Sequence, residues 1–466
     1  MQSPFDITAD LDTPVSAFLK LRPFKPRFLL ESVEGGERVA RYSFIGFGDA
    51  LEVRLDADGF TVHPTDGPIE RHPRPRDQAQ LLQWLRDALA RAPRPSPAVP
   101  NLPLPGGLVG ASAYDLVRYF ERIPTRLSPV PGMPEAVYLA PRSFLVFDHV
   151  TRGIALLHAG SEAERQALRR EVIQALRGGV PVAQTRTRLE KPTASLSRDA
   201  YIKNVRRVQE YIASGDVYQL VLSSQFSGAC ELDPFEAYRA LRLINPSPYM
   251  IYCELGDRTL VGSSPEALVR LSHGVAQLRP IAGTRPRGDT PESDMAHEIE
   301  LLADLKENAE HVMLVDLARN DLGRVAAAGS VHVAPYRVIE RYSHVMHMVS
   351  GVQGKLAAGK DGFDLFAAAF PAGTLVGAPK VRAMDIIEEL EPVRRGFYGG
   401  TYGYFGHGGD MDHAITIRTL MFHQGQYQYQ AGAGVVADSV PEREHDEVLA
   451  KSAVLRRALE LAAEGL

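Results

Sequence analysis

The fold class of this chain is decided by LEVRLDADGFTV, residues 51–62. Apolar side chains occupy every second position up to the pair Asp58-Gly59, and Phe60 and Val62 then resume the alternation. Alternation on both sides of an Asp-Gly pair predicts a β-hairpin, in which neighbouring strands run antiparallel. A second hairpin is expected where the apolar runs 144–147 and 154–157 flank a turn that ends in Gly153.

Helices are expected between and after these hairpins. Apolar residues at helical spacing predict helices over 77–91, 197–214, 295–311, 379–391 and 440–462. A further helix is expected to start at the capping box Ser161-x-x-Glu164 and to stop at Gly178-Gly179, and the helix over 440–462 is expected to start at the capping box Ser439-x-x-Glu442. Strand-like, glycine-rich pieces lie at 260–271, 275–281, 399–405 and 427–436. Because hairpins and helices mix without regular strand–helix–strand alternation, we expect an α+β fold.

Composition limits the class of protein. The 466 residues include 45% apolar and 23% charged residues, which is typical of a globular protein of more than one domain. Only two cysteines are present, so neither a disulfide framework nor a multi-thiolate metal site is expected, and a cytoplasmic location fits. A net charge of −5 argues against a nucleic-acid partner. No signal peptide and no apolar run long enough for a membrane span is found.

A candidate boundary between two regions lies near residue 190. The stretch 180–195 is polar, contains Pro181 and Pro192, and shows no periodicity. We therefore divide the chain into an N-terminal region, 1–190, and a C-terminal region, 191–466.

Two predicted helices each present carboxylates three residues apart, and hence on one face. These pairs are Glu307 with Glu310, and Glu444 with Glu447. One carboxylate from each helix could hold a hard cation such as Mg²⁺, with open positions left for substrate oxygens. The alternative is a solvated face in which Glu447 pairs with Lys451.

Three glycine-rich stretches, 281–284, 377–380 and 432–434, are interpreted as turns. Glycine lets backbone N–H groups approach an anion closely, although each stretch could equally be a structural turn. Neither the Gly-rich Lys-Ser/Thr phosphate loop nor the G-x-G-x-x-G dinucleotide pattern is present.

Three further side chains are candidates for acid–base or anion-binding roles. Arg418 follows the strand-like run 414–417, and an arginine among apolar residues must find an anion, either a protein carboxylate or a ligand. Glu266 follows a turn and could be a general acid or a surface residue. His347 lies in an apolar-leaning stretch and could be a catalyst or a core residue.

Nucleophilic catalysis has no support in the sequence. There is no Gly-x-Ser-x-Gly elbow, and neither Cys230 nor Cys253 lies in a glycine-rich setting like that of an amidotransferase nucleophile. Any glutamine hydrolysis must therefore come from another chain.

Six stretches taken in order resemble the chorismate-utilising enzymes. They are RPIAGTRPRG at 279–288, VDLARNDLG at 315–323, YSHVMH at 342–347, GTLVGAPKVR at 373–382, YGGTYGYF at 398–405 and QAGAGVV at 430–436. The resemblance runs from about residue 197 to the C-terminus. It implies an α/β sandwich of antiparallel-rich sheets with flanking helices, in which the N-terminal region belongs to the same compact body.

The resemblance also implies a site. Mg²⁺ would be held by Glu310 and Glu447 and would bridge to the ring carboxylate of chorismate. Glu266 would protonate the departing 4-hydroxyl, His347 would assist the later steps, and Thr374 would contact substrate nearby. Other substrate contacts would come from Gly283, Thr284, Tyr398, Arg418, Gly432, Ala433 and Gly434.

The choice among members of this family depends on Ala282. Members that use water or a lysine nucleophile resemble one another in carrying lysine at that position. With no ammonium group there, we expect ammonia to attack chorismate and pyruvate to be eliminated. A glutamine amidotransferase subunit would supply the ammonia, in a heterotetramer. The alternatives are the folate-pathway member, which aminates chorismate but keeps the pyruvyl group, and a non-catalytic protein that binds chorismate or tryptophan.

Two stretches resemble the tryptophan feedback site of such subunits: LLES at 29–32 and NPSPYM at 245–250. Ser32, Pro248, Tyr249 and Met250 would hold the inhibitor. Ala414 stands where some relatives carry a cysteine implicated in that inhibition.

Overall fold

The computed structural model of the chain describes residues 4–8, 11–33, 41–181, 187–341 and 345–466. Two stretches used above, 182–186 of the candidate boundary and 342–344 of one motif, lie outside the described residues. The helices are α1 (Pro14–Lys20), α2 (Gln78–Arg91), α3 (Glu162–Leu176), α4 (Arg198–Ala213), α5 (Pro234–Ile244), α6 (Pro291–Ala303), α7 (Leu305–Gly323), α8 (Gly362–Ala369), α9 (Lys380–Leu390) and α10 (Pro441–Glu464), with the short 3₁₀ helices η1 (Arg22–Phe24), η2 (Tyr114–Tyr119) and η3 (Gly373–Leu375).

The strands fall on both sides of the candidate boundary. In the N-terminal region they are β1 (Ile7–Thr8), β2 (Phe28–Glu31), β3 (Tyr42–Asp56), β4 (Gly59–Pro64), β5 (Glu70–His72), β6 (Gly107–Ser112), β7 (Ala136–Asp148) and β8 (Gly153–His158). In the C-terminal region they are β9 (Thr193–Ala194), β10 (Gln219–Ala229), β11 (Tyr249–Leu255), β12 (Arg258–Ser264), β13 (Ala267–Ser272), β14 (Val275–Leu278), β15 (Ile281–Pro286), β16 (His332–Val333), β17 (Val338–Arg341), β18 (Val345–Val349), β19 (Val352–Lys355), β20 (Gly377–Ala378), β21 (Thr401–Gly406), β22 (Met411–Ile415), β23 (Thr419–His423) and β24 (Gln426–Val435).

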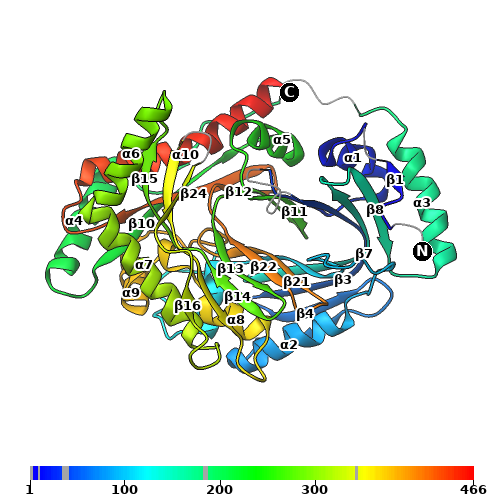
Figure 1. Ribbon diagram of the computed structural model, residues 1–466, viewed down its shortest axis with the longest axis horizontal. Helices are drawn as coiled ribbons and strands as arrows, with labels where there is room; N and C mark the ends of the chain where they lie inside the picture. The colour runs from blue at the N-terminus through cyan, green and yellow to red at the C-terminus, as the bar shows by residue number, and fades with distance from the viewer. Residues whose placement is uncertain (1–3, 9–10, 34–40, 182–186, 342–344) are drawn as a thin grey trace.

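The hairpin predicted at residues 51–62 is confirmed. β3 and β4 pair antiparallel, with Asp56 opposite Gly59 across the turn. The second predicted hairpin is β7 with β8. The described strands form one large curled sheet and a three-stranded sheet of β15, β18 and β17, flanked by the helices (Figure 1). The predicted α+β class with antiparallel pairing is therefore confirmed.

Strands from the two regions hydrogen-bond to one another inside the large sheet. β2 pairs with β11 so that Glu31 lies opposite Met250, and β6 pairs with β21. This pairing gives the N-terminal region a direct contact with the strands that surround the candidate site.

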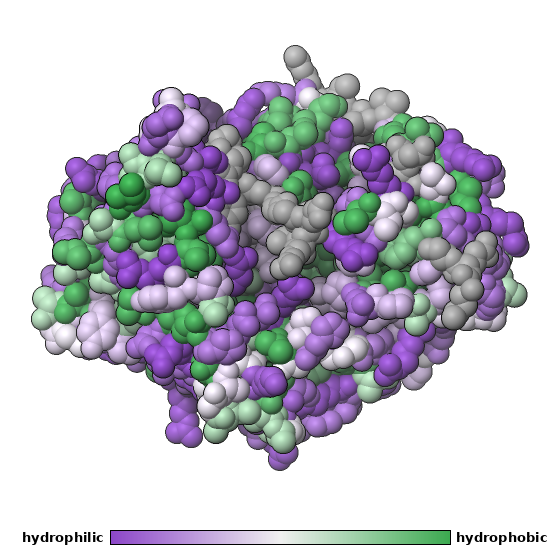
Figure 2. Space-filling view, viewed as in Figure 1, coloured by the Kyte–Doolittle hydropathy of each residue, from purple (hydrophilic) through white to green (hydrophobic). Residues whose placement is uncertain are grey.

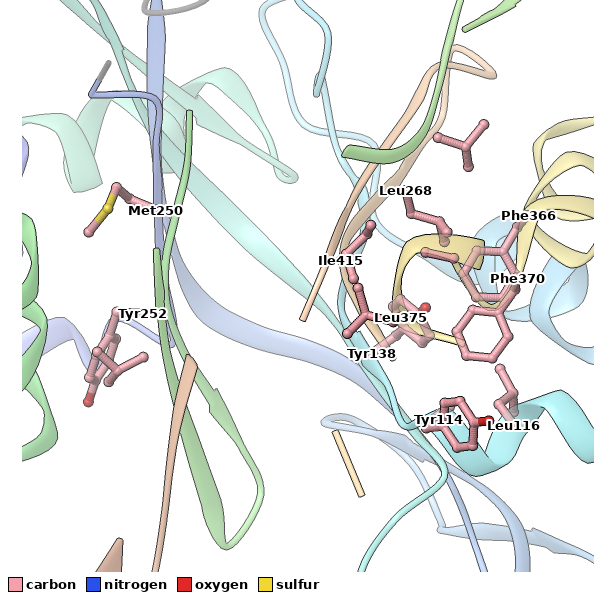
Figure 3. Packing of buried hydrophobic residues seen from close by; sticks show 14 of the residues in the cluster. Tyr114, Leu116, Tyr138, Met250, Tyr252, Leu268, Phe366, Phe370, Leu375 and Ile415 are labelled. Atoms are coloured by element: carbon pink, nitrogen blue, oxygen red, sulfur yellow. The ribbon is translucent and has the colours of Figure 1, made fainter. Parts of the chain in front are cut away.

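Apolar side chains fill the space between the sheet and the helices. Phe366, Phe370 and Leu375 lie together there with Leu268 and Ile415 (Figure 3). α10 packs on α4, α5 and β24, and α7 packs on β15 and α8. None of the helices within the described ranges is long and apolar enough to cross a membrane. On the face shown in Figure 2, hydrophilic and hydrophobic residues are intermixed.

The helix expected over 295–311 is instead two helices. α6 ends at Ala303 and α7 begins at Leu305, with Asp304 between them. The Asp304 carboxylate accepts hydrogen bonds from the backbone N–H groups of Lys306 and Glu307. An aspartate that caps a new helix in this way ends the preceding one, because its backbone must leave the helical conformation. Both members of the Glu307–Glu310 pair lie on α7.

Three further local predictions are wrong. The capping box at Ser439 is not formed, since Val440 precedes α10 without a side-chain cap and the Ser439 hydroxyl accepts a hydrogen bond from the N–H of Val436. The stretch 432–434 is not a turn but the middle of β24, where it pairs with β10. The stretch 281–284 likewise lies in β15, with an irregular register between Ala282 and Thr284.

Candidate active site

Glu266 and Thr374 meet although they are far apart in the sequence. Glu266 lies between β12 and β13, and Thr374 lies in η3. The Thr374 hydroxyl donates a hydrogen bond of 3.0 Å to Glu266 Oε1. Burial raises the pKa of the Glu266 carboxyl to about 7, although Thr374 and the positive charges of Arg418 and Lys451 act in the opposite direction. A carboxyl with a pKa near 7 can donate a proton at neutral pH.

Arg418, whose positive charge acts on this carboxyl, lies on a strained piece of backbone. It lies between β22 and β23 rather than inside a strand, and its φ of 48° is in the left-handed region. Its carbonyl accepts a hydrogen bond of 3.1 Å from the N–H of Ser263 on β12. A non-glycine residue in that region costs free energy and is enriched at functional sites.

Gly432 on β24 lies against the hydroxyl of Tyr398. A Cβ on Gly432 would lie 2.8 Å from the Tyr398 hydroxyl, so only glycine admits this ring. The carbonyl of Gly432 accepts a hydrogen bond of 3.1 Å from Lys451 Nζ on α10. Gly434 pairs with Val221 on β10. The candidate substrate residues on β24 and Tyr398 are thus adjacent, and Lys451 connects them to α10.

Carboxylates from α7 and α10 come near one another beside that lysine. Burial raises the pKa of Glu310, and the negative charges of Glu307, Glu447 and Glu444 raise it further. Glu447 forms an ion pair with Lys451, at 2.7 Å. This is the pairing expected for the solvated-face alternative. Within the part of the chain that the structure describes, no group of three or more acidic, histidine or cysteine side chains is arranged to hold a metal.

His347 and Thr284 meet on the small sheet. They lie opposite each other on β18 and β15, and His347 Nδ1 is 2.9 Å from the Thr284 hydroxyl. Gly283 has a φ of 74°, and a Cβ there would lie 2.9 Å from Leu301 and 3.2 Å from Glu307. The glycine therefore lets β15 pack against α6 and α7.

The candidate tryptophan residues lie together where β2 ends and β11 begins. β2 pairs with β11, and the N–H of Val33 donates to the carbonyl of Ser247 at 3.2 Å. This pairing puts the LLES stretch at 29–32 beside the NPSPYM stretch at 245–250. Among the described residues, the Ser32 hydroxyl is buried with no hydrogen-bond partner. A buried polar group without a partner is costly unless a ligand satisfies it.

Two residues of this site were missed in the sequence. Lys451 was considered only as the ion-pair partner of Glu447, yet it also contacts Gly432 and acts on Glu266. Arg395 is buried beneath Tyr398, with its guanidinium 5.6 Å from the ring centroid. The available signal was an arginine three residues before a candidate substrate tyrosine.

Similarity to known proteins defines the class of this chain. The family described as chorismate binding enzyme matches residues 25–457 of the chain. The chain belongs to this family.

Full-length relatives narrow the class to one kind of enzyme subunit. The chain is 47% identical to anthranilate synthase component 1 of Thermus thermophilus, over 98% of this chain and 97% of the relative. It is 43% identical to anthranilate synthase component 1 of Acinetobacter calcoaceticus, over 98% of this chain and 95% of the relative. Its structure is similar to that of anthranilate synthase component I from Streptococcus pneumoniae, with a TM-score of 0.79 and 32% identity over 97% and 99% of the two chains.

Proposed function

We propose that the chain is the large subunit of anthranilate synthase and converts chorismate and ammonia to anthranilate and pyruvate. The observation that carries the proposal is the half-buried Glu266 carboxyl, hydrogen-bonded by Thr374 and facing the positive charges of Arg418 and Lys451. An acid with a pKa of about 7 beside cationic groups suits a reaction in which a dianionic substrate loses a hydroxyl group.

Binding of chorismate would use the cationic and backbone groups around Glu266. Arg418 would neutralise a substrate carboxylate. Its left-handed backbone conformation sets the direction in which the side chain leaves the main chain. The Tyr398 hydroxyl would donate a hydrogen bond to the substrate, because burial raises the pKa of that phenol and keeps it protonated. Gly432 and Gly434 would let the backbone of this segment approach the substrate closely, because neither carries a side chain.

Glu266 would then deliver a proton to the 4-hydroxyl of chorismate as that group leaves. Thr374 occupies Oε1, which leaves Oε2 to carry the proton. His347, held by Thr284, would assist the later steps in which the ring becomes aromatic and pyruvate leaves.

Mg²⁺ would be held by Glu310 and Glu447. The fit rests on the crowding of carboxylates from α7 and α10. Burial first, and then this crowding, raise the pKa of Glu310, and a cation would relieve the repulsion. Two protein carboxylates suffice for Mg²⁺, which usually keeps water and substrate oxygens as its other ligands. When bound, the ion supplies charge neutralisation for the ring carboxylate of chorismate.

The nucleophile would be ammonia. Ala282 on β15 carries no ammonium or amine group, so the chain offers no lysine nucleophile at this position. A glutamine amidotransferase subunit would supply the ammonia in a cytoplasmic heterotetramer.

Tryptophan would inhibit the enzyme at Ser32, Pro248, Tyr249 and Met250. The unpartnered Ser32 hydroxyl supports a polar ligand there. The connection to the active site is short, because Asn245 Nδ2 donates to Ser263 Oγ at 2.9 Å and the Ser263 N–H donates to the carbonyl of Arg418.

The test is the product formed by the purified chain alone from chorismate, ammonium and Mg²⁺. We expect anthranilate, followed by its fluorescence, and pyruvate in equal amount. Aminodeoxychorismate without pyruvate would instead assign the chain to the folate-pathway alternative. Chorismate binding without turnover would make it a non-catalytic protein.

A further inference from the structure

A buried ion pair lies directly beneath the candidate chorismate site. Arg395 follows α9, and Glu391 lies four residues before it, with side-chain exposures of 1% and 2%. Two of the guanidinium N–H groups donate to the two carboxylate oxygens of Glu391, at 2.9 Å and 2.6 Å. Replacing a buried ion pair by apolar residues is often neutral or stabilising, so its presence here calls for a reason other than stability.

The remaining donors of Arg395 reach two segments that carry substrate residues. Nη1 donates to the carbonyl of Leu375 at 2.6 Å, directly after Thr374 in η3. Nη2 donates to the carbonyl of Val221 at 2.9 Å, and Val221 pairs with Gly434 across β10 and β24. One guanidinium therefore fixes η3 relative to β10, and through the pairing of β10 with β24 relative to Gly434.

The flat faces of the same guanidinium lie against two aromatic rings, one of them in the Tyr398 segment. Its carbon lies 5.6 Å from the ring centroid of Tyr398 and 4.9 Å from that of Tyr114. A Cβ on Gly399 would lie within 3.8 Å of Tyr114, Arg395 and Leu375, so these groups close around the backbone beside Tyr398. Figure 3 shows Tyr114 and Leu375 near one another in this part of the core.

Glu391 is connected to β24 through Ser223 of β10. Its Oε1 accepts hydrogen bonds from the N–H and hydroxyl of Ser223, at 2.9 Å and 2.5 Å. Ser223 lies opposite Gly432, and its hydroxyl accepts a hydrogen bond of 2.8 Å from Gln430. Both ends of the ion pair are thus bonded to β10, the strand that pairs with the glycine-bearing part of β24.

We propose that Arg395 and Glu391 are positioning residues that set the shape of the chorismate site by holding η3, β24 and the Tyr398 segment in register. Neither residue touches substrate in this assignment. Arg395 acts on Thr374 through the η3 backbone, and hence on Glu266, and it acts on Tyr398 through its ring face. The assignment deepens the proposed function and rests on it.

Arg395→Lys tests the proposal, because lysine keeps the charge but cannot reach two carbonyls and a carboxylate together. We expect KM for chorismate to rise by about 10-fold or more, since small misplacements of binding groups have effects of that size. We also expect the alkaline limb of the kcat–pH profile to move to higher pH, because a looser η3 weakens the hydrogen bond that holds down the pKa of Glu266.

Arg394→Lys is the matched control. Arg394 is also buried and also pairs with an acid and a carbonyl, those of Asp115 and Leu127, but within the described residues its hydrogen bonds reach neither η3 nor β10. We expect it to lower the melting temperature while leaving KM and the pH profile unchanged. Arg395→Lys with the same pattern as this control would overturn the proposal and leave the pair a structural element of the core.

Glu391→Gln keeps the test decisive if Arg395→Lys does not fold. Glutamine keeps the shape and can still accept from Ser223, so a folded variant with a raised KM supports the positioning role. Loss of near-ultraviolet circular dichroism in both variants, or a folded Glu391→Gln enzyme with unchanged KM, contradicts it. Wild-type turnover, measured first, separates these outcomes from a failure of the proposed function.

Discussion

Two walls of the candidate site differ in how their charges are held. The inner wall comprises Glu266, Thr374 and Tyr398, which lie on the β12–β13 connection, in η3 and before β21. Its groups are packed against the large sheet and fixed by hydrogen bonds and by the Arg395 guanidinium. The helical wall comprises Glu310 on α7 and Glu447 on α10, where carboxylates repel one another and one is paired with Lys451.

This difference indicates which wall has its charges satisfied without a ligand. A carboxyl that burial keeps partly protonated, with a hydroxyl donor already in place, needs no further partner in order to act as an acid. Carboxylates whose mutual repulsion raises a pKa become more stable when a cation joins them. We therefore expect changes to the inner wall to affect the chemical step, and changes to the helical wall to affect the requirement for Mg²⁺.

The largest expected effect is that of Glu266→Gln. Glutamine keeps the hydrogen bond from Thr374 but has no proton to give, so we expect kcat to fall by roughly 10²–10⁴-fold with KM little changed. Steady-state anthranilate formation measures both parameters. Glu254→Gln is the control, since Glu254 is a partly buried acid on β11 whose carboxylate accepts from Tyr252 instead. A kcat that falls equally in both variants would remove Glu266 from the acid role.

A smaller effect, of a different kind, is expected from Glu310→Gln and Glu447→Gln. Each change removes a carboxylate from the helical wall, so we expect the Mg²⁺ concentration for half-maximal activity to rise by about 10–100-fold. Mg²⁺-dependent protection against thermal unfolding provides a readout apart from turnover.

The control for the helical wall is Glu442→Gln, on the first turn of α10. Glu442 is paired with Arg206 and is not among the charges that raise the pKa of Glu310. If its replacement shifted the Mg²⁺ dependence as much as that of Glu447, the ion would not be held where we propose.

The sequence predicted the parts of this molecule that local rules govern. The hairpin at 51–62 forms as expected, because an Asp-Gly turn and an alternating pattern act over a dozen neighbouring residues. The stretch 432–434 was assigned to a turn, because glycine favours turns in isolation. Pairing with β10 and the close approach of Tyr398 decide its conformation instead, and both come from residues distant in the sequence.

The same limit applies to the site. The resemblance to chorismate-utilising enzymes supplied Glu266 and Thr374 as separate candidates, yet the hydrogen bond between them exists only after folding. Arg395 has no local pattern that distinguishes it from its neighbour Arg394. Its role follows from two carbonyl contacts and two ring contacts that the fold creates.

Replacement of Ser32 should leave both walls unchanged. Its hydroxyl is buried without a partner among the described residues, so Ser32→Ala removes a group that is costly unless tryptophan satisfies it. We expect the inhibition constant for tryptophan to rise by about 10-fold, which corresponds to one charge-free hydrogen bond of about 1.4 kcal/mol, with kcat unchanged. Ser43→Ala is the control, because that buried serine already bonds His149. Full sensitivity in Ser32→Ala would refute the allosteric assignment.

The smallest expected effect separates the contributions of burial and of Thr374 to the pKa of Glu266. Burial raises the pKa of Glu266 to about 7, and the Thr374 hydroxyl lowers it by stabilising the ionised carboxylate. Because the protonated form acts, kcat should fall as pH rises through that pKa. Thr374→Val removes the donor without changing the size of the side chain, so the alkaline limb should move upward by about half a unit to one unit. Thr374→Ser keeps the donor and should leave the limb in place. A limb that moves downward in Thr374→Val, or equally in both variants, would mean that another group limits the rate at high pH.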